Sequence, residues 1–139
     1  MKEQFCTYEI SLKLKELGFD EECFGYWRNE DFTFPLTIGK ITTKFDFDDN
    51  INYHNFKCLA PLWQQCIDWF REKHNINILI NPAYGCYNIS ITKYDEVEDD
   101  NKILDIDGLD FKDFIVYQEA REQAILKAIE LCKKNYHKI

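Results

Sequence analysis

The chain has little glycine and proline, no long apolar run and no export signal, and each shortage excludes a class of protein. Five glycines and three prolines in 139 residues are too few for flexible linkers or low-complexity segments. No run approaches the roughly 18 apolar residues that a membrane helix needs, and the first residues, MKEQFCTYE, lack the apolar core of a signal peptide. We therefore expect a cytoplasmic protein without a membrane partner.

Basic clusters are also missing, and the formal net charge of -8 comes almost entirely from one segment. Between Asp95 and Asp110 the chain has eight carboxylates and one lysine, so this segment carries -7 and the remainder -1. Nucleic-acid binding needs clustered Lys and Arg, so we expect no nucleic-acid partner. We interpret 95–110 as a solvated acidic loop, with an acidic docking loop or a cation site as the alternatives.

The motifs of common enzyme sites are absent. The chain has no G-x-x-x-x-G-K-[ST], G-x-G-x-x-G, G-x-S-x-G or H-E-x-x-H. The enzyme hypothesis that remains is a cysteine nucleophile, Cys58 or Cys86, activated by His54 or His74. Six cysteines offer such pairs by chance, so we favour a protein that is not an enzyme and predict no catalytic residue.

The even number of cysteines does not indicate disulfides, because no export signal accompanies it. We expect reduced thiols, with Cys66 and Cys132 buried on apolar helix faces. Zinc has little support, since the chain has no C-x-x-C pair and no two histidines four apart, although folding could still gather Cys58, Cys86 and a histidine. The cysteines are Cys6, Cys23, Cys58, Cys66, Cys86 and Cys132.

Two runs of oxygen ligands approach the calcium-binding EF-hand pattern and then depart from it. In DFDDNI and the residues after it, Ile51 replaces the turn glycine and Lys57 replaces the bidentate glutamate. In the second run Gly108 follows Asp107 directly, which is too early for the turn glycine of the pattern. We therefore predict no metal site and no cofactor.

Hydrophobic periodicity predicts three helices. The first follows Thr7, a candidate N-cap, and ends at Gly18 in a left-handed conformation. The second occupies 58–74, CLAPLWQQCIDWFREKH, and the third begins at about Tyr117, with alanines along one line. The apolar face of the second helix contains Leu62, Trp63, Cys66, Ile67, Trp69 and Phe70.

One aromatic stretch and the alternation of apolar and polar residues elsewhere predict the strands. Phe24 to Arg28 form the first, and the run FTFPLTIGKITTKFDFDD contains one or two more, with Pro35 at a sheet edge. The run NINILINP and a second run from Tyr87 form a hairpin around Tyr84-Gly85.

The predicted class is α+β, with the order α-β-β(-β)-α-β-β-α. Short turns between the strands favour antiparallel pairs, so we expect three helices packed on one small, mainly antiparallel sheet. A chain of this length fits a single domain over 1–139, with a variable segment at about 29–57 and the acidic loop at 95–110.

Three runs of the sequence carry a resemblance to known proteins: CTYEISLKLKELGFDEECFGYW, CLAPLWQQCIDWFREKHNI and YQEAREQAILKAIELCKK. They resemble a family of small uncharacterised proteins from Bacteroidetes chromosomes, prophages and phages. The segments 29–57 and 95–114 look like variable insertions of that family. The resemblance implies a mobile-element or phage setting and supplies no activity.

We predict a non-enzymatic protein-interaction module that binds a host or phage protein through exposed aromatic side chains and the acidic loop. Three tryptophans and eight tyrosines motivate this prediction. Trp63 and Trp69 lie on a helix and should be core. The candidate partner-binding residues are Tyr26, Trp27 and Arg28, since either Tyr26 or Trp27 should face outward unless a helix covers that side of the strand.

Two other functions and a homodimer stay open. A phage counter-defence factor that binds a small ligand predicts a concave pocket lined by aromatic side chains and a few polar groups. A cysteine-dependent enzyme predicts a reactive thiol beside a histidine. A homodimer could form at a sheet edge near Pro35 or through an uncovered aromatic strand.

Overall fold

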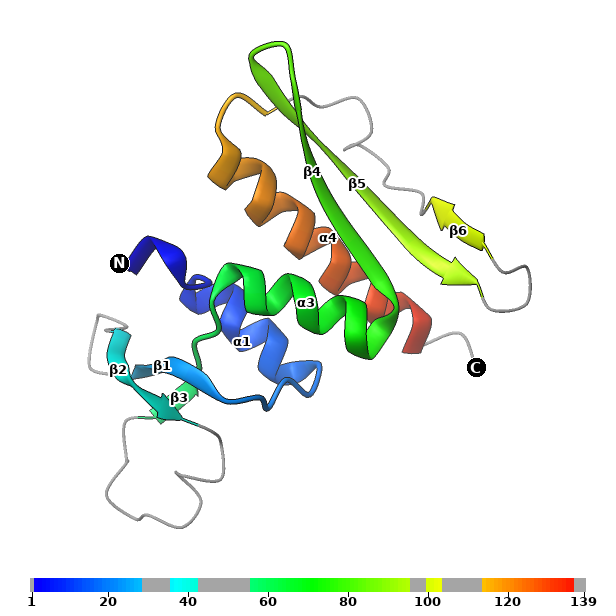
Figure 1. Cartoon of the computed structure of the whole chain (residues 1–139). Helices are drawn as coiled ribbons and strands as arrows, with labels where there is room; N and C mark the ends of the chain where they lie inside the picture. The colour runs from blue at the N-terminus through cyan, green and yellow to red at the C-terminus, as the bar shows by residue number, and fades with distance from the viewer. Residues whose placement is uncertain (1, 29–35, 43–55, 96–99, 104–113, 137–139) are drawn as a thin grey trace. The chain divides into compact units, whose positions relative to one another are not determined.

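A computed structural model describes residues 2–28, 36–42, 56–95, 100–103 and 114–136 (Figure 1). The contacts within the chain group it into two compact units, Met1–Cys66 and Ile67–Ile139, whose boundary falls inside helix α3 (Trp63–His74). The α+β class and the predicted order of elements are confirmed, with one added short strand before the last helix. The strands of these described ranges form two three-stranded sheets, where the sequence predicted one.

Helix α1 (Tyr8–Glu16) of the first unit begins and ends as the sequence predicts. The Thr7 side chain accepts a hydrogen bond from the backbone N–H of Ile10 at 3.3 Å, which satisfies one of the helix's unpaired donors. Gly18 has a φ of +97°, a left-handed conformation that costs glycine little, and the N–H of Phe19 then donates to the Leu14 carbonyl. These caps direct the chain out of α1 toward the sheet.

In this sheet β1 (Cys23–Arg28) is central and pairs antiparallel with β2 (Leu36–Thr42) and β3 (Phe56–Leu59). The prediction that the central helix starts at Cys58 is wrong, because Cys58 and Leu59 belong to β3 and the helix begins at Trp63. Pairing with β1 satisfies the backbone groups of this segment, and the Pro61 carbonyl accepts from the N–H of Cys6 at 2.8 Å.

The core of the first unit lies between α1 and this sheet. Its buried cluster consists of Phe5, Trp27, Cys58 and Ala60. The indole N–H of Trp63 donates to the carbonyl of Glu3, in the 3-10 turn η1 (Lys2–Gln4), at 2.8 Å. This bond holds the first residues of the chain against the start of α3.

The second unit is built on a hairpin of β4 (Ile76–Ala83) and β5 (Cys86–Asp95). The hairpin prediction is confirmed, and its two-residue turn has positive φ at both Tyr84 (+41°) and Gly85 (+81°). A third strand, β6 (Asp100–Ile103), pairs with the end of β5. Part of the predicted acidic loop is therefore sheet, and the rest of 95–110 lies outside the described residues.

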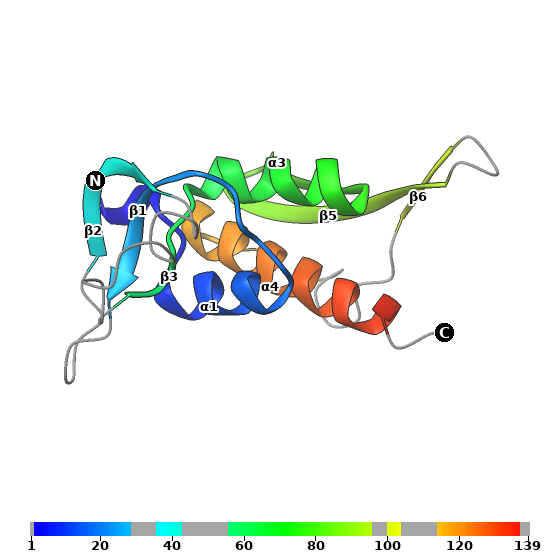
Figure 2. The same ribbon diagram turned by 90° about the horizontal axis from the view of Figure 1, so that it is seen from below.

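Helix α4 (Tyr117–Tyr136) packs on one face of this hairpin, and its start at Tyr117 is as predicted (Figures 1 and 2). The predicted line of Ala120, Ala124 and Ala128 is fully buried, and these small side chains allow a close approach of the helix to the strands. The strands contribute to the same core with Ile76, Ile78, Ile89 and Ile91, all buried.

Gly25 allows a test of how closely β1 and β2 approach each other in the first unit. A Cβ built on Gly25 would lie 2.7 Å from the Thr37 carbonyl oxygen of the neighbouring strand, and backbone cannot move aside as a flexible side chain can. We expect Gly25→Ala to lower the free energy of unfolding by about 1–3 kcal/mol, measured by urea unfolding. The adjacent exposed position is the control, because Phe24→Leu should change stability by less than about 0.5 kcal/mol. Equal effects would contradict the tight approach of β1 and β2.

Candidate functional site

The predicted partner-binding residues are not all on the surface. Trp27 is buried, with 5% of its area exposed, and faces α1, so of the two alternatives Tyr26 and Trp27 it is not the one that faces outward. Its indole N–H donates to the Ser11 hydroxyl at 3.1 Å, and that hydroxyl donates to the Cys6 carbonyl at 3.4 Å. The ring of Tyr8 meets the indole edge-on at 6.1 Å. Helix α1 therefore covers this side of β1.

The other face of β1 carries the remaining two candidates. Tyr26 and Arg28 are half-buried on this face, and Phe24, two residues before Tyr26, is 52% exposed. The prediction missed Phe24, although the two-residue period that links it to Tyr26 and Arg28 was readable from the sequence. The partner-binding role of Tyr26 and Arg28 stays a prediction.

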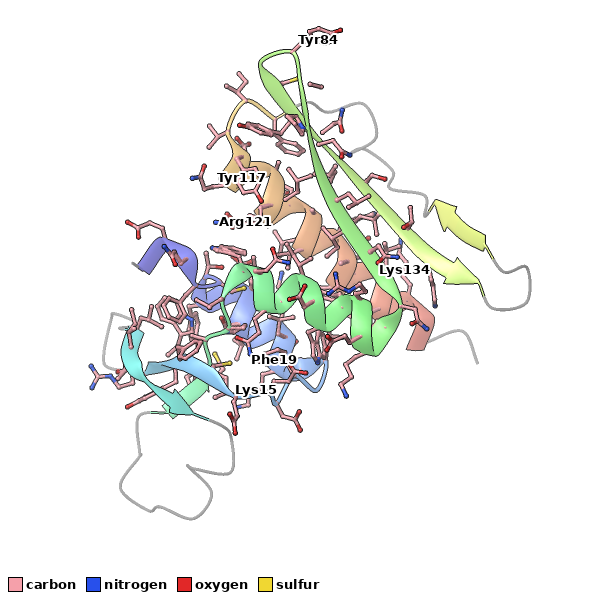
Figure 3. All side chains as sticks on the ribbon, viewed as in Figure 1. Lys15, Phe19, Tyr84, Tyr117, Arg121 and Lys134 are labelled. Carbon is pink, nitrogen blue, oxygen red and sulfur yellow. The ribbon has the colours of Figure 1, made fainter. Side chains whose placement is uncertain are left out.

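One cavity of about 220 Å³ lies at the carboxyl end of α1. The Lys15 ammonium beside it donates to the Lys57 carbonyl at 2.9 Å, and Phe19 supplies the aromatic ring among its described lining residues (Figure 3). Ligand pockets usually enclose about 300–1,000 Å³ and several aromatic side chains, so this cavity gives little support to a nucleotide-sized ligand. Its lining consists of Ser11, Lys15, Gly18, Phe19, Asp20, Cys58 and Leu59.

Cys58, one of the two candidate nucleophiles, is a poor one. It is fully buried, and burial raises the pKa of its thiol to about 12. The thiol is therefore protonated near pH 7, whereas catalysis needs the thiolate. Burial also raises the pKa of Cys23 to about 12 and that of Cys132 to about 11, as expected of thiols that act as small apolar side chains.

The other candidate pair, Cys86 and His74, is separated by the length of the hairpin. Cys86 begins β5 beside the turn, whereas His74 precedes Ile76, which pairs with Lys93 at the far end. At about 3.4 Å per residue, the path along β5 from Cys86 to Lys93 spans roughly 24 Å. The half-buried Cys86 thiol instead donates to the Ala83 carbonyl at 2.8 Å. His54, the alternative base, lies outside the described residues.

Within the described ranges, no group of three or more His, Cys, Asp and Glu side chains could hold a metal ion. The aspartates of both EF-hand-like runs lie outside those ranges, whereas Lys57 lies within them. The helices of the same ranges are too short or too polar to cross a membrane.

Exposed apolar side chains occur at the hairpin turn and at the start of α4 in the second unit. Phe114 pairs with Tyr87 near the turn of the hairpin. This pairing places Ile115, Val116 and Tyr117, which lead into the first turn of α4, beside the hairpin. Ile115 is 82% exposed, and Val116 and Tyr117 are also exposed. Tyr84 is fully exposed and points away from the strands at the tip of the turn (Figure 3). We call Tyr84, Ile115, Val116 and Tyr117 the hairpin patch.

Tyr117 is held in place while part of it stays exposed. Its ring meets the Tyr87 ring edge-on at 5.5 Å, and the guanidinium of Arg121 lies 5.5 Å from the centre of the same ring. A ring fixed in this way loses little further conformational freedom when it binds a partner. The sequence prediction missed the hairpin patch, although Ile115 and Val116, placed beside the polar residues that begin a helix, were a readable signal.

Comparisons of the chain with models of protein families, with curated proteins and with solved structures found no match. The resemblance to the Bacteroidetes and phage family therefore stays a prediction.

The bond between Trp27 and Ser11 can be tested by removing the hydroxyl. Ser11→Ala leaves the buried indole N–H without its acceptor, so we expect a loss of about 1–3 kcal/mol in the free energy of unfolding. Urea unfolding followed by tryptophan fluorescence measures it. Ser90→Ala, at a half-buried serine of β5, is the control and should change stability by less than about 0.5 kcal/mol. An unchanged midpoint for Ser11→Ala would contradict a structural role for this bond.

The cysteines can be ranked by alkylation. We expect iodoacetamide to modify half-buried Cys86 at least ~10-fold faster than buried Cys58 in the native protein near pH 7, because Cys58 is shielded and protonated. Mass spectrometry of peptides after short exposures measures both rates, and the same reaction in guanidinium should bring them close together. Rapid native modification of Cys58 would contradict this account and restore the enzyme hypothesis.

Proposed function

We propose that this chain is a non-enzymatic protein-interaction module of a mobile element or phage, and that the hairpin patch binds a protein of the host or of the phage. The exposure of Tyr84, Ile115, Val116 and Tyr117 at one end of the second unit supports the interaction role. The resemblance described above supports the setting. The proposal moves the expected contact from Trp27, which is buried, to this patch.

The backbone of Tyr84 is the observation that carries the proposal. Tyr84 has a φ of +41°, in the left-handed region, where a residue with a Cβ is less stable than glycine and where hairpin turns favour asparagine. Its side chain is fully exposed, so no burial within the unit offsets this loss of stability. An aromatic ring at a strained and solvated position is therefore better explained by binding than by folding.

The aliphatic side chains beside the turn add to this argument. Isoleucine is among the residues most often buried, yet Ile115 is 82% exposed, and Val116 next to it is exposed as well. Exposed apolar side chains and tyrosines are both enriched at protein interfaces. A partner that desolvates them gains about 25 cal/mol for each square ångström of apolar surface buried.

Tyr84→Asn separates binding from folding. Asparagine adopts a positive φ more readily, so we expect the variant to be more stable by about 0.5–1 kcal/mol. We also expect it to lose the ring that a partner would bury. The measurement is quantitative capture from a Bacteroidetes cell extract with immobilised full-length chain, together with thermal unfolding of each variant.

The controls test whether capture depends on the hairpin patch. Ile115→Ser should lower capture of the same protein at least ~10-fold, whereas Phe24→Ala, at an exposed aromatic of the first unit, should leave it unchanged. Hydrogen exchange with the purified partner should then protect the residues around Tyr84 and Ile115. The proposal is wrong if capture is absent, or if Tyr84→Asn and Ile115→Ser capture the same proteins as the wild type in equal amounts.

A further inference from the structure

The outer edge of β4 is a second candidate surface of the second unit. The strand order β4-β5-β6 places β4 at the end of its sheet, paired with β5 on one side. Within the described part of the chain, no strand or isolated backbone bond pairs with its other side. An edge strand of eight residues is a ready template for another strand, which proteins either block or use.

The register of the hairpin determines which backbone groups this edge presents. The N–H and C=O of Tyr87 both bond to Phe114, at 2.6 and 2.8 Å, so they point away from β4. Tyr87 is opposite Pro82, and in an antiparallel ladder pairs that bond to each other alternate with pairs that point their groups outward. Pro82 and the residues at alternate positions before it, Ile80, Ile78 and Ile76, therefore direct their backbone groups to the free edge.

The sequence of β4 is self-complementary about one residue. The run Asn77-Ile78-Leu79-Ile80-Asn81 reads the same in both directions. If a second copy pairs antiparallel about Leu79, isoleucine is opposite isoleucine, asparagine opposite asparagine and Leu79 opposite its own copy. The residues Ile78 and Ile80, whose backbone groups point outward, then form the hydrogen-bonded pairs, as the register requires.

The Leu79 side chain provides the apolar contact in this arrangement. It lies on the face of the hairpin opposite the buried isoleucines, among polar residues such as Asn77, Asn81 and Ser90, and 52% of its area is exposed. In the self-paired arrangement Leu79 is in a pair without backbone hydrogen bonds, where Cα atoms are about 4.5 Å apart and side chains approach most closely. Each leucine would cover the other.

We propose that two copies of this chain associate through β4, antiparallel and with a two-fold axis at Leu79, into one continuous sheet with both α4 helices on the same face. Ile78 of one copy and Ile80 of the other exchange N–H···O=C bonds on each side of the axis. The Ile76 N–H donates to the Pro82 carbonyl of the second copy. Pro82 has no N–H of its own, so the pairing ends there. Because the two copies are related by a two-fold axis, the assembly is a closed dimer.

This surface is distinct from the hairpin patch, and the two can be tested separately. Sedimentation equilibrium of the full-length chain should give the mass of two chains for the wild type, and of one chain for Leu79→Lys, because two ammonium groups would meet at the axis. Tyr84→Lys, a matched charge at the exposed turn, should remain dimeric. Circular dichroism and thermal unfolding show whether each variant is folded.

Cysteines introduced one at a time into β4 test the register of the pairing. Leu79→Cys should form a disulfide-linked dimer on mild oxidation, because the two Cα atoms would lie about 4.5 Å apart, within the range that a disulfide spans. Asn77→Cys and Asn81→Cys should not cross-link alone, but an equal mixture of the two should, since these positions face each other across the axis. Non-reducing electrophoresis measures all four cases against the wild type.

These results decide the proposal even if one variant fails to fold. A dimeric wild type, a monomeric Leu79→Lys and cross-linking of Leu79→Cys support it. A wild type that is monomeric in the high micromolar range overturns it and leaves the edge to a different occupant, such as an extended peptide. Cross-linking of Asn81→Cys alone, without cross-linking of Leu79→Cys, overturns the register and with it the proposal.

Discussion

The second unit depends on one constraint, the register of the β4–β5 hairpin. The two-residue turn at Tyr84-Gly85 has positive φ at both positions, and such turns match the right-handed twist of the strands that they join. A slip of one residue would turn every side chain to the opposite face. The same register buries Ile78 and Ile91 against α4, points Tyr87 toward Phe114 and leaves Leu79 in solvent. The hairpin patch and the free edge of β4 both follow from it.

Exposure, and not residue type, separates the aromatic side chains that stabilise the fold from those available to a partner. Trp27 is the largest side chain of the predicted partner site, yet a hydroxyl on α1 accepts its indole N–H and the ring is buried. Tyr84 lies in a turn that disfavours its residue type and is fully exposed. The buried thiols follow the same principle, since burial holds the pKa of Cys58 at about 12 and makes it a packing residue.

Much of the local structure could be predicted, and the errors concern pairing between distant segments. The Thr7 cap, the left-handed Gly18, the turn at Tyr84-Gly85 and the start of α4 are all determined by a few neighbouring residues. The assignment of Cys58 to a helix was wrong because the residue pairs with β1, about thirty positions earlier, and periodicity carries no information about such a partner. The same limit explains why one sheet was expected and two are found.

For the candidate surfaces, the sequence by itself determined which residues alternate along each strand and that NILIN is self-complementary. It also determined that the chain lacks the motifs of common enzymes. Only the tertiary structure decided which face of β1 is covered by α1, which side of β4 is left unpaired among the described residues, and where Ile115 lies relative to the turn. The physical reason is that dihedral preferences and side-chain period act between neighbours, whereas burial depends on segments far apart in the chain.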